Sequence, residues 1–247
     1  MQPLRQIPFV VLLLALLSLP AVAEETAAPP APAKAKAKVE VKGRLEVVGG
    51  QRVLTLWGTP RERGFAQGYL LAEQIVDGVE RDFERIMNKR FKQLYTTLLT
   101  KLVIPRFQFE ARELAEMEGL FAGVQAKLPA ERLTIDTLGR AFELVDLKAL
   151  NTFGDWYGLG CSSLALWGDL TKDGKTLVGR NFDFPAFDLV LKHQYVVVRA
   201  PDGKRPGQVG VSYPGCFGTL TGMNVHGVFV AIHDVRIKPT LDKALRP

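Results

Sequence analysis

The chain has few of the residues that build metal centres or disulfide frameworks: its 247 residues include three histidines and two cysteines. The histidines, His193, His226 and His233, lack the spacing to carboxylates that metal ligands show, so we expect no metal and no other cofactor. No cluster of basic residues indicates nucleic-acid binding. After the first 23 residues no apolar run approaches the roughly 20 residues of a membrane span, so we expect no stable span in the mature protein.

The amino-terminal stretch, MQPLRQIPFVVLLLALLSLPAVA, does contain one short apolar run, over residues 7–19, between Arg5 and a pair of small residues. This pattern is typical of a secretory signal peptide over residues 1–23, with a retained anchor as the alternative. We therefore expect a periplasmic or secreted protein. Residues 24–50 are rich in alanine, proline and lysine and predict a disordered tether.

The sequence from residue 51 to 160 predicts one strand followed by helices. RVLTLWG, residues 52–58, alternates as a strand does, and Thr59-Pro60 is a typical helix start with an N-cap threonine and an N1 proline. Apolar residues at helical spacing follow. We expect helices over residues 61–91, 91–103, 107–128 and 134–150.

From Cys161 onward the period changes to that of strands, which are separated by turn signals such as KDG, PDGK and NVHG. Helices come first and strands second, and the change falls at Gly160-Cys161. This order predicts an α+β fold. We expect strands over residues 163–167, 176–181, 195–200, 208–213 and 228–235.

The Gly160-Cys161 pair suggests self-cleavage of the chain. The Cys161 thiol can attack the carbonyl of Gly160, and a glycine permits the close approach and unusual backbone conformation that this attack needs. Hydrolysis of the resulting thioester would leave Cys161 with a free α-amino group. Because such an amine has a reference pKa of about 7.7–8.0, it can act as the base for its own side chain without a histidine.

Asp183 is a candidate carboxylate to hold that amine. Asp173-Gly174 is a hairpin signal, so the strand that begins at Cys161 folds back on the strand that ends at Asp183. A tight two-residue turn would place Cys161 opposite Ala186 instead. We therefore expect a bulge or a wider loop near the glycines of this turn.

At this point a family resemblance is visible. GCSSLALWGDLTKDGKTLVGRNFDFP resembles the start of the catalytic chain in N-terminal nucleophile (Ntn) hydrolases, in the branch of acyl-CoA:6-aminopenicillanate acyltransferase, choloylglycine hydrolase and the acid ceramidase-like amidases. RERGFAQGYLLAEQI and ELAEMEGLFAGV resemble propeptide-side segments of the acyltransferases, and TGMNVHGVFVAIHD resembles a later strand. The resemblance implies an αββα sandwich, with a mainly helical propeptide-side segment at 51–160 and the start of the catalytic region at 161–247.

The resemblance also implies residue roles. Cys161 is the autoproteolytic and catalytic nucleophile, Asp183 orients its amine, and Arg180 supports the nucleophile. His233 lies on the strand where the family has its oxyanion-hole asparagine, and a neutral histidine can donate a hydrogen bond to an oxyanion. The candidates for substrate binding are Asn181, Asn224 and Trp156.

These features predict an exported, self-cleaving cysteine amidohydrolase or acyltransferase that acts on a small-molecule amide, with its two cleaved chains associated. The alternative is an inactive envelope binding protein with a Cys161–Cys216 disulfide. Arg180 with Asp183 as an ordinary ion pair, and Asn224 as a turn residue, are the plainer interpretations. A complete sandwich needs more strands than residues 161–247 provide, so we expect a fragment or a truncated relative.

Overall fold

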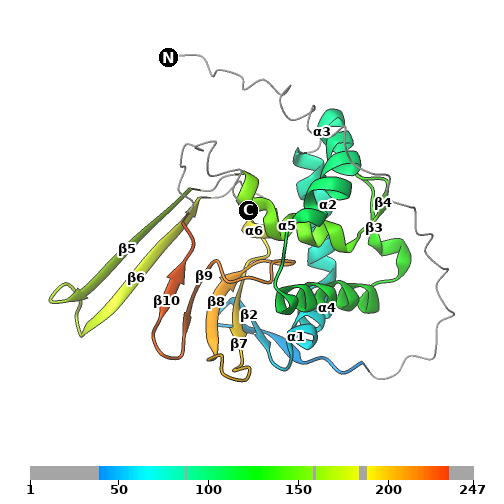
Figure 1. Ribbon diagram of the computed structural model, residues 1–247. Helices are drawn as coiled ribbons and strands as arrows, with labels where there is room; N and C mark the ends of the chain where they lie inside the picture. The colour runs from blue at the N-terminus through cyan, green and yellow to red at the C-terminus, as the bar shows by residue number, and fades with distance from the viewer. Residues whose placement is uncertain (1–38, 87, 158–159, 184–187, 234–247) are drawn as a thin grey trace, which may run out of the picture. The chain divides into compact units, whose positions relative to one another are not determined.

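The structure is a computed structural model that describes residues 39–86, 88–157, 160–183 and 188–233 (Figure 1). It has the α+β class that the sequence predicts. Residues 1–38, which include the expected signal peptide and most of the expected tether, lie outside the described residues. Within the described ranges, no helix is long and apolar enough to cross a membrane.

A six-stranded sheet joins the two halves of the sequence. Its strand order is β1-β2-β7-β8-β9-β10, and every pair is antiparallel except β2–β7, which is parallel. The central parallel pair therefore links a strand that precedes Cys161 to one that follows it. The strands are β1 (Gly43–Val48), β2 (Gln51–Leu56), β7 (Tyr195–Arg199), β8 (Gln208–Ser212), β9 (Thr221–Asn224) and β10 (Phe229–Ala231).

Strand β1 corrects the end of the predicted tether, because residues 43–48 are ordered in the sheet and not a disordered linker. Gly49 and Gly50 both have positive φ, at 57° and 81°, and they form the two-residue turn that returns the chain to β2. A Gly-Gly pair between two alternating segments is a strong hairpin signal. The lysine and alanine content of residues 24–50 predicts a tether, but at its end the structure follows the Gly-Gly hairpin signal.

The helices follow the predicted pattern with one break and one error. The first predicted helix is divided at Leu71 into α1 and α2, and the second continues from an α-helix into a π-helical segment. The helical elements are α1 (Pro60–Leu70), α2 (Ala72–Ile86), α3 (Lys89–Leu94), η2 (Tyr95–Val103), η3 (Ile104–Arg106), α4 (Ala111–Lys127), η4 (Ala130–Leu133), α5 (Leu144–Tyr157) and α6 (Asp188–Leu191).

The prediction of a helix from residue 134 is wrong for its first part. Residues 134–141 form the short antiparallel pair β3 (Thr134–Ile135) and β4 (Arg140–Ala141), and α5 begins only at Leu144. The turn between them has Gly139 at a φ of 70°, a conformation that ends helical periodicity. Apolar residues at compatible spacing hid this turn from the pattern.

Helices α1 and α4 pack with their backbones in contact. Gly64 and Gly68 on α1 face Gly119 and Gly123 on α4, and a Cβ atom at any of them would lie 1.9 to 2.2 Å from a backbone oxygen of the opposite helix. The glycines of RERGFAQGYL and EMEGLFAGV therefore serve close helix packing. Figure 1 shows these two helices side by side against the sheet.

The core lies between these helices and one face of the sheet. Leu54 and Leu56 of β2 and Val197 of β7 are buried in the same cluster as Ala66 of α1 and Leu120 of α4. The remaining two long strands, β5 (Gly160–Gly168) and β6 (Gly174–Asp183), form a separate two-stranded hairpin. The strands expected at 163–167, 176–181, 195–200 and 208–213 are confirmed; β9 was missed, and β10 begins and ends within the range predicted for it.

Candidate functional site

The β5–β6 hairpin sets the position of Cys161. Gly160 pairs with Asp183 and Cys161 with Phe182, and the register shifts between Leu166 and Gly168 before the hairpin closes through a loop at residues 169–173. The predicted irregularity is thus confirmed: a wider loop and a shifted register replace the tight two-residue turn. As a result the first residues of β5 lie opposite the last residues of β6.

This register collects four side chains on one face of the hairpin. Directly opposed residues of an antiparallel pair share a face, and successive residues alternate between faces. The pairs Cys161–Phe182 and Ser163–Arg180 therefore lie on the same face. Asn181, two positions before Asp183, lies on the opposite face.

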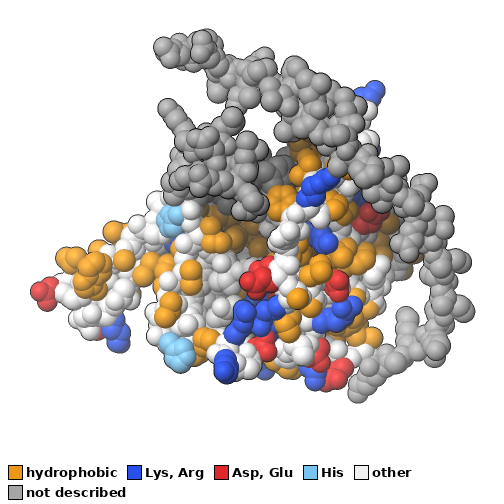
Figure 2. Space-filling model, viewed as in Figure 1, with side chains coloured by type: hydrophobic (Ala, Val, Ile, Leu, Met, Phe, Trp, Pro, Cys, Tyr) orange, Lys and Arg blue, Asp and Glu red, His pale blue; other side chains and the backbone are white. Residues whose placement is uncertain are grey.

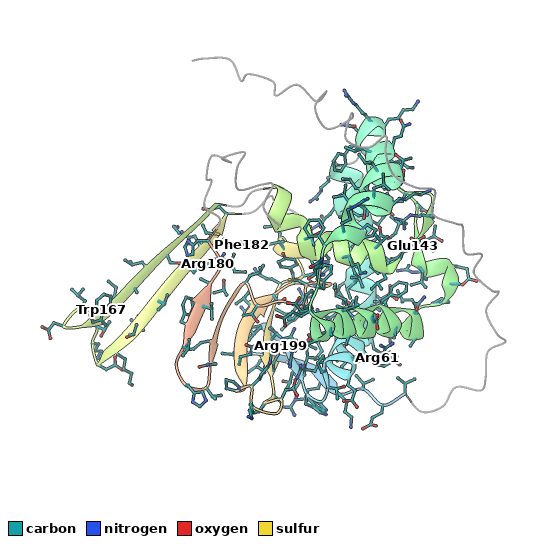
Figure 3. All side chains as sticks on the ribbon, viewed as in Figure 1. Arg61, Glu143, Trp167, Arg180, Phe182 and Arg199 are labelled. Atoms are coloured by element: carbon teal, nitrogen blue, oxygen red, sulfur yellow. The ribbon has the colours of Figure 1, made fainter. Side chains whose placement is uncertain are left out.

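Arg180 connects the thiol to the main sheet. Its Nη2 atom lies 3.0 Å from the Cys161 sulfur and donates to the carbonyl oxygen of Ile232, just after β10, at 2.8 Å. Its guanidinium also lies over the ring of Phe182, 4.5 Å from the centroid. Figure 3 shows Arg180 and Phe182 at the end of β6 nearest the sheet.

His233 joins the same group of side chains. Its Nε2 atom lies 2.8 Å from the hydroxyl of Ser163, and both residues are exposed. The preceding residue, Ile232, is held twice, since its carbonyl accepts from Arg180 and its N–H donates to the carbonyl of Leu220. Strands β5 and β6 and the segment just after β10 thereby contribute a thiol, a guanidinium, a hydroxyl and an imidazole to one small region. Because β10 ends at Ala231, His233 follows the strand on which it was expected to lie.

Asp183 lies against Gly160. A Cβ atom added to Gly160 would be 3.2 Å from the Cβ of Asp183 and 3.4 Å from its Oδ2. The carboxylate therefore borders the bond between Gly160 and Cys161, and the site has little room for a larger residue before the cysteine. Asp183 thus pairs with Gly160, one position before the cysteine whose amine it was expected to meet, and an ion pair between Asp183 and Arg180 is not among the interactions of the described residues.

A cavity of about 430 Å³ lies beside Arg180. Most of its wall is apolar, and the Nε atom of Arg180 is buried without a hydrogen-bond partner among the described residues. The cavity can therefore take an apolar group beside Arg180, the residue that contacts the thiol. The residues around it are Arg180, Asn181, Phe182, Val190, Leu191, Gln194, Val211, Ser212, Tyr213, Leu220 and Thr221.

The two cysteines are free thiols in different surroundings, which contradicts the alternative of a Cys161–Cys216 disulfide. Burial raises the pKa of the Cys216 thiol. Its loop is held by Asn151 of α5, which donates to the carbonyl of Gly215 and accepts from the N–H of Phe217. Cys216 is thus a buried structural residue, while Cys161 is half-buried beside a cation.

The other predicted residues do not join this group as side-chain partners. Asn224 caps the β9–β10 turn, where its Oδ1 accepts from the N–H groups of His226 and Val228 at 3.0 Å, so the plainer turn interpretation describes it. Asn181 is exposed and borders the cavity. The side chain of Trp156 lies outside the described residues.

A second, smaller cavity of about 200 Å³ is strongly charged but internally paired. Buried Glu116 of α4 bonds Arg199 of β7, and Asp202 accepts from Arg63 and Arg112 at 3.1 and 2.7 Å. These pairs tie α1 and α4 to the strands. In the described ranges, no three His, Cys, Asp or Glu side chains lie close enough together to hold a metal ion.

Sequence reasoning missed Ser163 and the carbonyl of Ile232. Ser163 could have been found, because residues two apart on a strand share a face and GCSSL puts a serine two positions after the cysteine. A backbone carbonyl carries no signal in the sequence. Its role depends on how the end of β10 meets the hairpin.

No protein-family model matches the chain. It is similar to protein dcd1A of Dictyostelium discoideum, with 27% identity over 192 residues that cover 70% of this chain and 42% of dcd1A. The chain thus spans less than half the length of this relative, and a match of this identity and coverage does not define its family.

Proposed function

We propose that the protein is a self-cleaving cysteine amidohydrolase or acyltransferase of the Ntn-hydrolase type, with Cys161 as nucleophile. One observation carries the proposal: a single register of the β5–β6 hairpin brings Arg180 to the Cys161 sulfur and Asp183 to Gly160. A structural cysteine needs neither neighbour. A cysteine that must carry charge and become a chain terminus needs both.

The first reaction in this proposal is cleavage of the chain. The Cys161 sulfur attacks the carbonyl carbon of Gly160, the C–N bond between the two residues breaks, and the proton of the thiol ends on the released α-amine. Water then hydrolyses the thioester, which gives a carboxylate at Gly160 and restores the thiol. Asp183, which lies against Gly160, is the carboxylate that would hold the new ammonium group.

In the second reaction the substrate replaces the peptide. The α-amine takes the thiol proton as the sulfur attacks an amide carbonyl, and then gives it to the leaving amine. Arg180 stabilises the sulfur, and His233 is the candidate donor to the oxyanion. Water or a second amine then accepts the acyl group from Cys161, which gives hydrolysis or transfer.

The cavity beside Arg180 supports an apolar acyl group as the substrate portion that is bound. The apolar residues that line it are Phe182, Val190, Leu191, Val211 and Leu220. Apolar walls bind alkyl or aromatic groups by removing them from water, at about 25 cal/mol for each Å². We therefore infer a small-molecule amide whose acyl part is largely apolar.

We also propose that this fold is one half of an αββα sandwich. Helices cover one face of the six-stranded sheet, and the other face carries apolar residues on neighbouring strands, such as Val196 of β7 with Val209 and Val211 of β8 and Met223 of β9. Val209, Val211 and Met223 are exposed. A sheet face of this composition is typical of packing against a second sheet.

The cleaved chains should remain associated in this proposal. The parallel pairing of β2 with β7, the Glu116–Arg199 pair and the contacts of Asn151 all join residues before Gly160 to residues after Cys161. The predicted signal peptide supports a periplasmic or secreted location, where the protein would meet its substrate. A binding protein on the same scaffold remains the competing function, without the disulfide.

Hydrolysis of a series of arylamides with increasingly long apolar acyl groups tests this function. We expect turnover that depends on Cys161, with Cys161→Ala inactive and Cys216→Ala active, because Cys216 takes no part in the chemistry. Rates should rise with acyl length until the cavity is filled. Binding of the amides without product release in the wild-type protein would support the binding protein instead.

A further inference from the structure

The contact between Ser163 and His233 has a chemical role that the functional proposal leaves open. The hydroxyl oxygen and Nε2 are 2.8 Å apart, a good hydrogen-bond distance, although both side chains are exposed. Exposed serine and histidine side chains can hydrogen-bond to water as well as to each other. A specific contact between residues 70 positions apart therefore indicates that the imidazole is held in one orientation.

The contact lies next to the thiol. Ser163 is two positions after Cys161 on β5, so the two side chains share a face at neighbouring positions, about 6–7 Å apart along the strand. Arg180 holds the residue before His233 through its carbonyl while also bonding the Cys161 sulfur. Ser163 and Arg180 thus fix the ring and the backbone of the same short segment beside the nucleophile.

The direction of this hydrogen bond is tied to which ring nitrogen carries the proton. A neutral imidazole has one N–H donor and one acceptor, whereas a serine hydroxyl can donate or accept. When the Ser163 hydroxyl donates to Nε2, the proton is on Nδ1. In that tautomer the ring keeps one N–H donor, on the nitrogen that does not face Ser163.

We propose that Ser163 is a positioning residue that holds His233 in the Nδ1–H tautomer, so that Nδ1–H donates to the oxyanion formed at Cys161. The proposal rests on the proposed function for its oxyanion and on the contact between Ser163 and His233 for the position of the ring. An oxyanion hole needs a donor fixed before the reaction begins. A histidine that was free to exchange tautomers would offer the oxyanion a lone pair part of the time.

The tautomer is tested without catalysis, in the full chain with Cys161→Ala, which neither cleaves nor turns over. Nitrogen-15 NMR of the histidine rings, at a pH where they are neutral, reports which nitrogen is protonated, and His233→Gln identifies the resonances. We expect His233 to be protonated at Nδ1, and Ser163→Ala to move both ring resonances toward the other tautomer. Ser162→Ala, on the opposite face of β5, is the matched control and should move neither. A wild-type ring protonated at Nε2, or one unmoved by Ser163→Ala, overturns the proposal.

Kinetics of amide hydrolysis provide the second measurement. Ser163→Ala should lower kcat about tenfold with KM unchanged, less than the roughly 100-fold loss expected for His233→Ala, and Ser163→Thr should restore the rate because it keeps the hydroxyl. A rate unaffected by Ser163→Ala contradicts the role in catalysis. A wild-type protein without amidase activity overturns the proposed function and the oxyanion role, whereas the NMR result still decides the tautomer.

Discussion

Two parts of the molecule have similar alternating strands and very different surroundings. Leu54 and Leu56 of β2 are fully buried beneath helices, whereas Leu164, Trp167 and Leu177 of the β5–β6 hairpin are 59 to 63% exposed. Figure 2 shows hydrophobic side chains on the surface of this hairpin, and Figure 3 shows Trp167 toward its far end. The alternating sequence pattern is alike in both parts. Their exposure differs because helices cover the apolar face of β2, whereas these hairpin side chains are not covered.

Different interactions hold the two parts in place. The helix-backed part of the sheet, which includes β2 and β7, is held by close packing and buried ion pairs. It contains none of the residues proposed for catalysis. The hairpin carries the proposed nucleophile, and in the described part of the chain polar contacts from Arg180 and Ser163 to residues 232 and 233 link it to the end of β10. The site therefore depends on a few directed hydrogen bonds, while stability depends on the core.

The largest expected effect is the loss of a buried charge in the helix-backed part. Glu116→Gln leaves Arg199, only 8% exposed, without its anion, so we expect the free energy of unfolding to fall by about 3–5 kcal/mol in urea denaturation. The control is Glu118→Gln, whose partner Arg61 is well exposed, and it should cost less than about 1 kcal/mol. Equal effects would contradict the distinction between buried and surface pairs.

Removing one leucine from each part compares their packing directly. Leu56→Ala should lower the free energy of unfolding by about 2–4 kcal/mol, because it leaves a cavity in the core. Leu177→Ala should change it by no more than about 0.5 kcal/mol, since Leu177 is exposed. If Leu177→Ala costs as much as Leu56→Ala, the hairpin is covered in solution by a layer that buries it.

Adding a methyl group to a glycine should also change the stability of the two parts by different amounts. Gly68→Ala brings a Cβ to 2.0 Å from the carbonyl oxygen of Leu120, so α1 and α4 must move apart at a cost of about 1–3 kcal/mol in thermal or chemical unfolding. Gly179→Ala, on β6, meets nothing within 4 Å and should be neutral or slightly stabilising. A neutral Gly68→Ala would show that the two helices do not pack this closely.

The smallest expected effect is a dependence on acid pH. The hydrogen bond from Arg63, with a further one from Arg112, holds the pKa of Asp202 below its usual value. A carboxylate with a lowered pKa stabilises the fold above about pH 4 and loses that contribution as the pH falls through its folded pKa. We expect Asp202→Asn to be less stable than wild type at pH 7 and nearly equal to it near pH 2. Asp173→Asn, at the exposed tip of the hairpin, should show a smaller difference throughout.

Much of the fold could be predicted from the sequence, because periodicity and caps report local structure. Thr59 and Glu62 form the capping box that starts α1, as the Thr59-Pro60 signal indicates. The errors fall at turns made by glycines, Gly49-Gly50 and Gly139, and at the short strand β9. Strand order was not predictable, since the parallel β2–β7 pair joins residues about 140 positions apart.

The site could be predicted in part for a similar reason. Cys161, Arg180 and Asp183 are close in sequence around one hairpin, so the turn signal and the alternation of faces predict that they lie near one another. His233 follows β10, far along the sequence from the hairpin, and was named through a resemblance alone. Its contact with Ser163, and the use of the Ile232 carbonyl by Arg180, depend on tertiary docking that no local pattern encodes.

The central claim is that the bond between Gly160 and Cys161 is cut, and intact-mass analysis of the protein purified from its full-length gene tests it most directly. We predict two chains, one that ends at Gly160 and one that begins with Cys161, and a single uncut chain for Cys161→Ala. Cys216→Ala should be cut like the wild type. A wild-type protein that stays in one piece, with the Gly160–Cys161 bond intact, would contradict the claim.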